Sequence, residues 1–139
     1  MKHIKNYLHI LKEGIHSLDL PRLLQIEDII FNKIKQNKKI FVCGNGGSAS
    51  VANHFLCDFN KGIKLSSNNK LKPKVVSLSD NMETILAVAN DISFNKIFSF
   101  QLDNHFSKGD IVILLSCSGS SPNIIDALNY CKKNKIFTI

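Results

Sequence analysis

Two short segments rich in glycine and serine contain the residues best suited to binding chemistry. The first runs from Gly44 to Ser48 with the sequence GNGGS, and the second runs from Ser116 to Ser121 with the sequence SCSGSS. Each segment follows a short apolar run and precedes a stretch with the apolar spacing of a helix. The first turn of a helix attracts anions through its unpaired N–H groups, while glycine allows close approach and serine adds hydroxyl donors. The two segments therefore predict a site for an anion.

Two other interpretations of these segments stay open from the residues alone. Each segment could be a tight strand-to-helix turn in which a serine only caps the helix, as Ser121 would cap a helix that begins at Pro122. The spacing Gly44-x-Gly46-x-x-Ala49 also satisfies a relaxed dinucleotide fingerprint, which needs an acidic residue about 20 positions further on. The next acidic candidate, after the second predicted strand, is Asp80, well beyond that distance, and the G-x-x-x-x-G-K-S/T phosphate loop is absent. We therefore expect no nucleotide cofactor.

A histidine and a carboxylate follow the first segment at a helical spacing. His54 and Asp58 are four residues apart, so they share one face of the predicted helix. Such a pair can bind one metal ion or pass a proton, although on most helices it is only part of a solvated face. Another helix is predicted to open with the D-x-x-E capping box of Asp80–Glu83 and to run through Ala89. Asn90 and Asp91 follow it, and by themselves they indicate a turn.

The elements that would position these residues are those of an α/β domain. Short apolar runs predict buried strands at residues 39–43, 75–78 and 111–115, and the start of a fourth at 136–139. Because helical patterns separate these runs, the sheet should be parallel, with right-handed crossovers and a layer of helices on each face. The polar residues 61–73 predict a surface loop. A chain that stops inside a strand pattern is expected to lack the C-terminal part of its domain.

Two amphipathic helices are predicted before the first strand. Apolar residues recur with helical spacing from the N-terminus to Leu18, and again from Pro21 to about Gln36. We expect a helical segment over residues 1–36 and, over residues 37–139, the α/β domain that carries the anion site. Helices that precede any strand need a surface to cover, so they should pack on the sheet or on another subunit.

Composition restricts the class of protein. The formal net charge is +7, but the basic residues are scattered and include a single arginine, Arg22, so no direct binding to nucleic acid is expected. The apolar runs are too short to span a membrane, and lysines interrupt the N-terminal stretch where a secretory signal would be apolar. The four cysteines form no C-x-x-C pair and are expected to be buried thiols. These features predict a soluble, cytoplasmic protein.

With these motifs in their order, the chain resembles the phosphoheptose isomerase branch of the sugar isomerase (SIS) family. The segments that carry the resemblance are Cys43–Ala49, His54–Phe55, Ala89–Asp91, Gly109–Asp110 and Ser116–Asn123. The resemblance implies a Rossmann-like SIS domain, built as a three-layer α/β sandwich with a parallel sheet. It also implies a ketose–aldose isomerase that converts sedoheptulose 7-phosphate to D-glycero-D-manno-heptose 7-phosphate, through an enediol, for lipopolysaccharide biosynthesis. Members of the family are usually homotetramers with sites between subunits, often with one zinc ion per site.

The resemblance also implies roles for individual residues. The substrate-binding residues would be Asn45, Gly46, Gly47, Ser48, Asn90, Asp91, Ser116, Cys117, Ser118 and Ser121. His54 and Asp58 would be both the catalytic pair and metal ligands. Asp58 stands where the family has a glutamate that acts as the base, and a base misplaced by about 1 Å can cost on the order of 100-fold in rate. The family's remaining metal and acid/base residues, a glutamine and a histidine, correspond to positions beyond residue 139. The alternative is a non-catalytic SIS protein that senses a phosphosugar or binds a protein partner such as a replication initiator.

Overall fold

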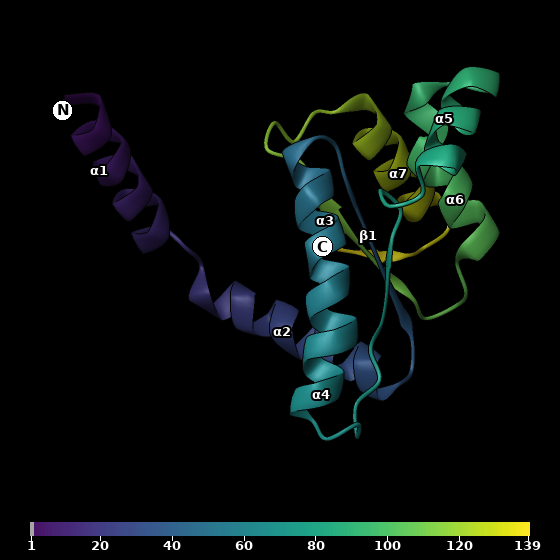
Figure 1. Cartoon of the computed structure of the whole chain (residues 1–139), viewed down its shortest axis with the longest axis horizontal. Helices are drawn as coiled ribbons and strands as arrows, with labels where there is room; N and C mark the ends of the chain where they lie inside the picture. The colour runs from purple at the N-terminus through teal and green to yellow at the C-terminus, as the bar shows by residue number, and fades with distance from the viewer. Residues whose placement is uncertain (1) are drawn as a thin grey trace.

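The computed structural model describes residues 2–139, in which helices alternate with the strands of one sheet (Figure 1). The strands are β1 (Lys39–Gly44), β2 (Lys74–Ser77), β3 (Ile111–Leu115) and β4 (Phe137–Thr138). The helices are α1 (Lys2–His16), α2 (Leu20–Lys35), α3 (Gly47–Cys57), the π-helix η1 (Asp58–Ile63), α4 (Lys64–Ser66), α5 (Met82–Asp91), the 3₁₀-helix η2 (Phe94–Lys96), α6 (Ile97–His105) and α7 (Pro122–Lys133).

The four strands form one parallel sheet in the order β2-β1-β3-β4. Gly44 at the end of β1 pairs with Leu115 at the end of β3. Because neighbouring parallel strands end at the same edge, the segments that follow them also begin side by side. The prediction of an α/β fold with a parallel sheet is confirmed, and this register brings the two glycine- and serine-rich segments together.

The sheet is buried on both faces. In β1, Phe41 and Cys43 belong to the core that packs against α5, α6 and α7, whereas Ile40 and Val42 belong to the core formed with α2 and α3. Each of these four side chains is fully buried. Strands covered on both sides are continuously apolar, which is why the sequence showed short apolar runs without alternation. The predicted three-layer arrangement is confirmed.

Two local predictions differ from the structure. Residues 61–73 are not all loop, since the helix that carries His54 continues through η1 and α4 as far as Ser66. The helix predicted to open with an Asp80–Glu83 capping box is instead capped by Asn81, whose side chain accepts a 2.7 Å hydrogen bond from the Thr84 N–H. This helix ends at Asp91 rather than Ala89, so Asn90 and Asp91 belong to it.

The two N-terminal helices differ in how they pack. The last turn of α2 is anchored by the buried Ile34, which joins the core between the sheet and α3. In contrast, α1 has no buried residue and projects away from the body of the domain (Figure 1). No helix within residues 2–139 has both the length and the apolar content needed to cross a membrane. The division of the chain at residue 36 stays a prediction.

Candidate functional site

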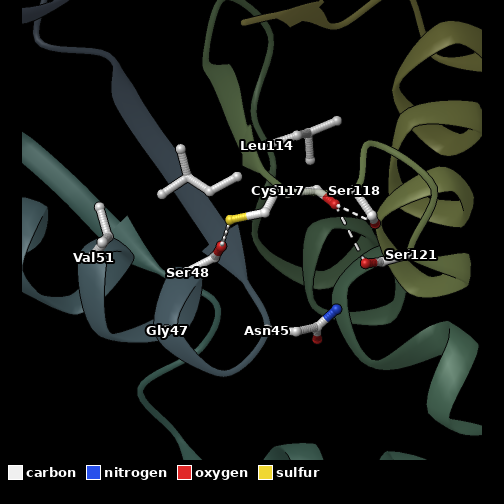
Figure 2. Close-up of a pocket in the computed structure, with 10 residues that line it drawn as sticks. Asn45, Gly47, Ser48, Val51, Leu114, Cys117, Ser118 and Ser121 are labelled. Atoms are coloured by element: carbon white, nitrogen blue, oxygen red, sulfur yellow. Dashed lines mark hydrogen bonds between the residues drawn. The ribbon is translucent and has the colours of Figure 1, made fainter. Parts of the chain in front are cut away.

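The two glycine- and serine-rich segments form the walls of one open pocket at the carboxyl ends of β1 and β3 (Figure 2). Its volume is about 680 Å³. The residues that line it are Asn45, Gly47, Ser48, Val51, Leu114, Leu115, Ser116, Cys117, Ser118 and Ser121. Seven of these are predicted substrate-binding residues, so the fold brings most of the predicted set together.

The first segment turns sharply from β1 into α3, and glycine makes this possible. A Cβ atom at Gly44 would lie 2.6 Å from Ser48 Cβ and 2.7 Å from the Ser48 carbonyl carbon, which is too close for any other residue. Gly46 has φ 52° and ψ −121°, a backbone conformation that favours glycine. Ser79 holds the end of β1, because its hydroxyl donates to the Gly44 carbonyl and accepts from the Gly44 N–H.

In the second segment, hydroxyl groups gather around Ser116. Its Oγ lies 3.3 Å from Ser121 Oγ and 3.4 Å from Ser118 Oγ, and it accepts a 3.1 Å hydrogen bond from the Gly119 N–H. Pro122 begins α7 as predicted, but Ser121, although it occupies the N-cap position, makes no side-chain cap. Instead its hydroxyl faces Ser116, inside the pocket. The N-cap residues of α3 and α7, both wholly described, make no side-chain cap, although the Ser48 N–H in the first turn of α3 donates to the Asn45 carbonyl and the Ile124 N–H in that of α7 donates to Asn123 Oδ1.

The two walls also touch one another directly. Ser48 Oγ lies 4.0 Å from Cys117 Sγ (Figure 2). The side-chain amides of Asn45 and Asn123 also exchange two hydrogen bonds of 2.8 Å each. Hydroxyl, thiol and amide donors from the two loops therefore surround one small volume, as binding of a phosphate group requires.

His54 and Asp58 lie further along the same helix, outside the lining of this pocket. The distance from His54 Nε2 to Asp58 Oδ2 is 3.3 Å, and the side chains are 78% and 61% exposed. They line a neighbouring hollow with Ser50, Val51 and Phe55, and Val51 borders both hollows. Within residues 2–139, no group of three or more histidine, cysteine or acidic side chains is placed to hold a metal ion. A protein zinc site uses three or four such ligands, so this pair alone does not make a complete one.

The other predicted residues lie away from the pocket lining. Asn90 and Asp91 are exposed at the end of α5, where Asn90 Nδ2 donates a 2.8 Å hydrogen bond to Asp91 Oδ1. Gly46 is also exposed and supplies the turn rather than a wall. The sequence assigned no role in the site to Asn123, Ser79 or Val51, because nothing in their spacing indicates that they line the pocket or support its loops.

The cysteines separate into two kinds, so the expectation of four buried thiols is half wrong. Cys43 and Cys131 are buried in the core, whereas Cys57 and Cys117 are exposed. Burial raises the pKa of the Cys43 thiol from its ordinary 9.0 to about 12, with a smaller contribution from Cys131. Burial also raises the pKa of Cys131, to about 11. Both core thiols therefore stay protonated and act as apolar packing groups.

Similarity to known proteins agrees with this geometry. A family model described as the SIS domain matches residues 3–139. The chain is 33% identical over 135 residues to a probable phosphoheptose isomerase of Thermoplasma acidophilum, covering 97% of this chain and 72% of that protein. It is 30% identical over 129 residues to the phosphoheptose isomerase of Chlorobaculum tepidum, covering 93% of this chain and 61% of that protein. This chain therefore spans about two thirds of the length of such relatives.

Solved structures give the same result. The phosphoheptose isomerase GmhA from Neisseria gonorrhoeae superposes with a TM-score of 0.83 and 27% identity, covering 99% of this chain and 69% of that chain. A phosphoheptose isomerase from Francisella tularensis has a TM-score of 0.85 at 24% identity, covering 99% of this chain and 70% of that chain, which supports the fold. The predicted resemblance to the phosphoheptose isomerase branch is confirmed. The chain belongs to the SIS domain family.

Proposed function

We propose that the chain is a phosphosugar isomerase that converts sedoheptulose 7-phosphate to D-glycero-D-manno-heptose 7-phosphate. The observation that carries the proposal is the pocket at the carboxyl ends of β1 and β3, where the hydroxyls of both loops meet two uncapped helix starts. This arrangement suits a phosphate ester. The choice of a heptose phosphate as the substrate rests on the relatives named phosphoheptose isomerase, which align over nearly the whole of this chain.

The phosphate would lie between the two loops. Ser48 and Cys117 approach it from opposite walls, and the hydroxyls of Ser116, Ser118 and Ser121 reach it from the second loop. A hydroxyl can rotate to donate to a phosphate oxygen, whereas a thiol is a weaker donor. The pocket therefore has more donors on the side of the second loop.

The reacting carbons would lie along α3, toward His54 and Asp58. At 1.5 Å per residue, Asp58 is about 15 Å along the axis from Ser48, but helical side chains tilt back toward the N-terminus. An extended sugar phosphate bridges this separation better than a compact one, which favours a long-chain sugar. Asp58 would remove the proton from C1 and return it to C2, while the hydroxyl proton moves from O1 to O2 through an enediol. His54, 3.3 Å from Asp58, would orient the carboxylate.

We also propose that His54 and Asp58 contribute two ligands to a zinc ion, with the other ligands supplied from outside residues 2–139. When bound, zinc would polarise the oxygens on the reacting carbons of the sugar. We further propose a homotetramer, a cytoplasmic location and a role in lipopolysaccharide biosynthesis. The location and the pathway rest on the resemblance alone. The exposed apolar face of α1 also supports assembly.

The first experiment tests binding. Sedoheptulose 7-phosphate should raise the melting temperature of the chain, whereas unphosphorylated sedoheptulose should not. It should also slow alkylation of Cys117 by iodoacetamide, while the exposed Cys57, which lies outside the pocket, should react at an unchanged rate. Stabilisation by a dinucleotide without any effect of the phosphosugar would overturn the assignment.

The second experiment separates an enzyme from a binding module. In deuterated water, an isomerase exchanges deuterium into C1 or C2 of sedoheptulose 7-phosphate, because the enediol loses and regains its carbon-bound proton. Binding without exchange, both with and without added zinc, would leave the non-catalytic alternative. The comparisons do not favour that alternative, since the relatives reported above carry the name of an isomerase.

A further inference from the structure

A pair of side-chain amides joins the two loops of the pocket, and one of the two residues, Asn123, has so far been given no role of its own in the site. Asn45 Nδ2 donates to Asn123 Oδ1, and Asn123 Nδ2 donates to Asn45 Oδ1, each at 2.8 Å. Asn45 directly follows β1, and Asn123 is the second residue of α7. The pair therefore connects the start of the first loop to the helix that follows the second loop.

The surroundings of Asn123 fix the orientation of both amides. Asn123 is only 1% exposed, and its Oδ1 also accepts a 3.0 Å hydrogen bond from the Ile124 N–H. If this amide flipped, its NH₂ group would face the N–H of Ile124, and a buried donor would lose its partner. Because Asn123 is fixed, Asn45 must direct its oxygen and one N–H toward Asn123.

One N–H of Asn45 remains, since a side-chain amide has two donors. Asn45 lines the pocket, and Figure 2 shows its amide directed into the space below Ser121. We infer that Asn123 is a positioning residue, which acts through Asn45 to aim this N–H at the bound phosphosugar and to hold the two loops in register. The inference rests on the proposed phosphosugar site, but it assigns to that site a residue that does not line the pocket.

A double-mutant cycle on the full chain tests the inference. The variants are Asn45→Ala, Asn123→Ala and the double variant, with the dissociation constant of sedoheptulose 7-phosphate measured by calorimetry. Each single variant should weaken binding about 10-fold, because each leaves one aimed hydrogen bond unmade. The double variant should bind no more weakly than Asn45→Ala, since Asn123 acts only through Asn45. An effect of Asn123 that does not pass through Asn45 would instead give additive losses.

Two further variants control for folding and for helix stability. Asn123→Asp keeps the size of the side chain and the contact with Ile124, but it offers no N–H to Asn45, so it should also weaken binding about 10-fold or more. Asn134→Ala removes the exposed side chain at the C-cap of the same helix, where its Nδ2 donates to the Tyr130 carbonyl, and should leave binding unchanged. If Asn123→Ala were unfolded, Asn123→Asp would take its place in the cycle.

The outcomes separate this inference from the proposed function. If the unaltered chain binds neither sedoheptulose 7-phosphate nor inorganic phosphate, the proposed function and the role of Asn123 are both wrong. If it binds and the Asn123 variants bind equally well, or their losses add to that of Asn45→Ala, only the role of Asn123 is overturned. In an active preparation, the Asn123 variants should raise KM by the same factor and change kcat little, because the pair lies at the phosphate end of the site.

Discussion

Gly44 is the single residue on which the shape of the pocket depends most directly. Gly44→Ala would place a methyl group 2.6–2.8 Å from the Cβ atom and the backbone carbonyl of Ser48, and backbone cannot move aside cheaply. We expect a loss of about 1–3 kcal/mol in the free energy of unfolding, together with weaker phosphosugar binding. Urea denaturation and calorimetry measure the two effects.

Gly62→Ala is the matched control for this change. Gly62 lies in η1, and a methyl group there would meet nothing within 4 Å. Alanine is the better residue inside a helix, so this variant should be as stable as the original chain or slightly more stable. Equal stabilities for the two variants would mean that the turn after β1 is looser than the structure indicates.

The core thiols Cys43 and Cys131 predict a loss of stability at alkaline pH. Burial raises the pKa of Cys43 to about 12 and that of Cys131 to about 11, against 9.0 for an ordinary thiol. Above pH 9 the unfolded chain releases these protons while the folded chain retains them. Their contribution to stability is therefore complete below pH 9 and declines as the pH rises toward 11–12.

Urea denaturation between pH 8 and pH 10.5 tests this linkage. The free energy of unfolding should fall less steeply with pH in Cys43→Ala than in the unaltered chain, although the variant is less stable throughout because it leaves a small cavity. Cys57→Ala, which removes an exposed thiol, should leave the slope unchanged. The same slope in Cys43→Ala and the unaltered chain would contradict the prediction.

At the scale of single residues, the sequence was sufficient where a residue's type and its place in the chain indicate its role. Glycines and serines between a buried strand and a helix favour an anion site over a plain turn when two such loops occur in one domain, so Ser48 and Ser118 could be predicted as binding residues without a structure. The partnership of Asn45 with Asn123 could not, because the two residues are 78 positions apart and meet only through the pairing of β1 with β3. The hydroxyl of Ser121 was predicted as a cap for a related reason, since its contact with Ser116 depends on the loop's own fold.

Among the elements, η1 carries a contact that stabilises the edge of the sheet. Asn60 Nδ2 donates to the Val75 carbonyl, and Asn60 Oδ1 accepts from the Val75 N–H, both at 2.9 Å. The side chain thus pairs with β2 as a neighbouring strand would. Asn60→Ala should cost about 1–3 kcal/mol, because Val75 is buried and its backbone groups would lose their partners.

Hydrogen exchange gives this prediction a local readout. In Asn60→Ala the Val75 amide should exchange faster than in the unaltered chain, while amides of β3, which lies on the far side of β1, should keep their protection. Asn60→Asp retains the acceptor and should protect the Val75 N–H nearly as well. Unchanged exchange at Val75 in Asn60→Ala would show that this contact does not form in solution.

The elements themselves were predictable where one physical signal dominates. Strand β3 was predicted with its observed bounds, and β1 to within one residue, because strands buried on both faces are continuous apolar runs. The π-helix was missed, since Lys61 and Gly62 have the composition of a loop. Asn60, in the same π-helix, makes a long-range contact with β2, and no local sequence pattern predicts a contact of that kind.

At the scale of the whole molecule, α1 has an apolar face that no other part of the described chain covers. Its apolar residues Ile4, Leu8, Leu11 and Ile15 recur with helical spacing, yet all are exposed. A helix of this length is marginally stable in water when it packs against nothing, and an exposed apolar face of this extent marks an interaction surface. The sequence predicted the helix and its stripe, but it could not choose between the sheet and another subunit as the covering surface.

The structure leaves the stripe of α1 uncovered within one chain, so we expect a second copy to cover it. Leu8→Glu places a charge in the middle of the stripe and should convert the assembled protein to smaller species in sedimentation velocity. His9→Glu adds the same side chain one position along, on the polar side of the helix, and should leave the assembly intact. Because α1 contributes nothing to the buried core, the dissociated Leu8→Glu chain should retain its pocket and its phosphate binding. A monomeric unaltered chain, or an assembly that tolerates Leu8→Glu, would assign the stripe to a different partner.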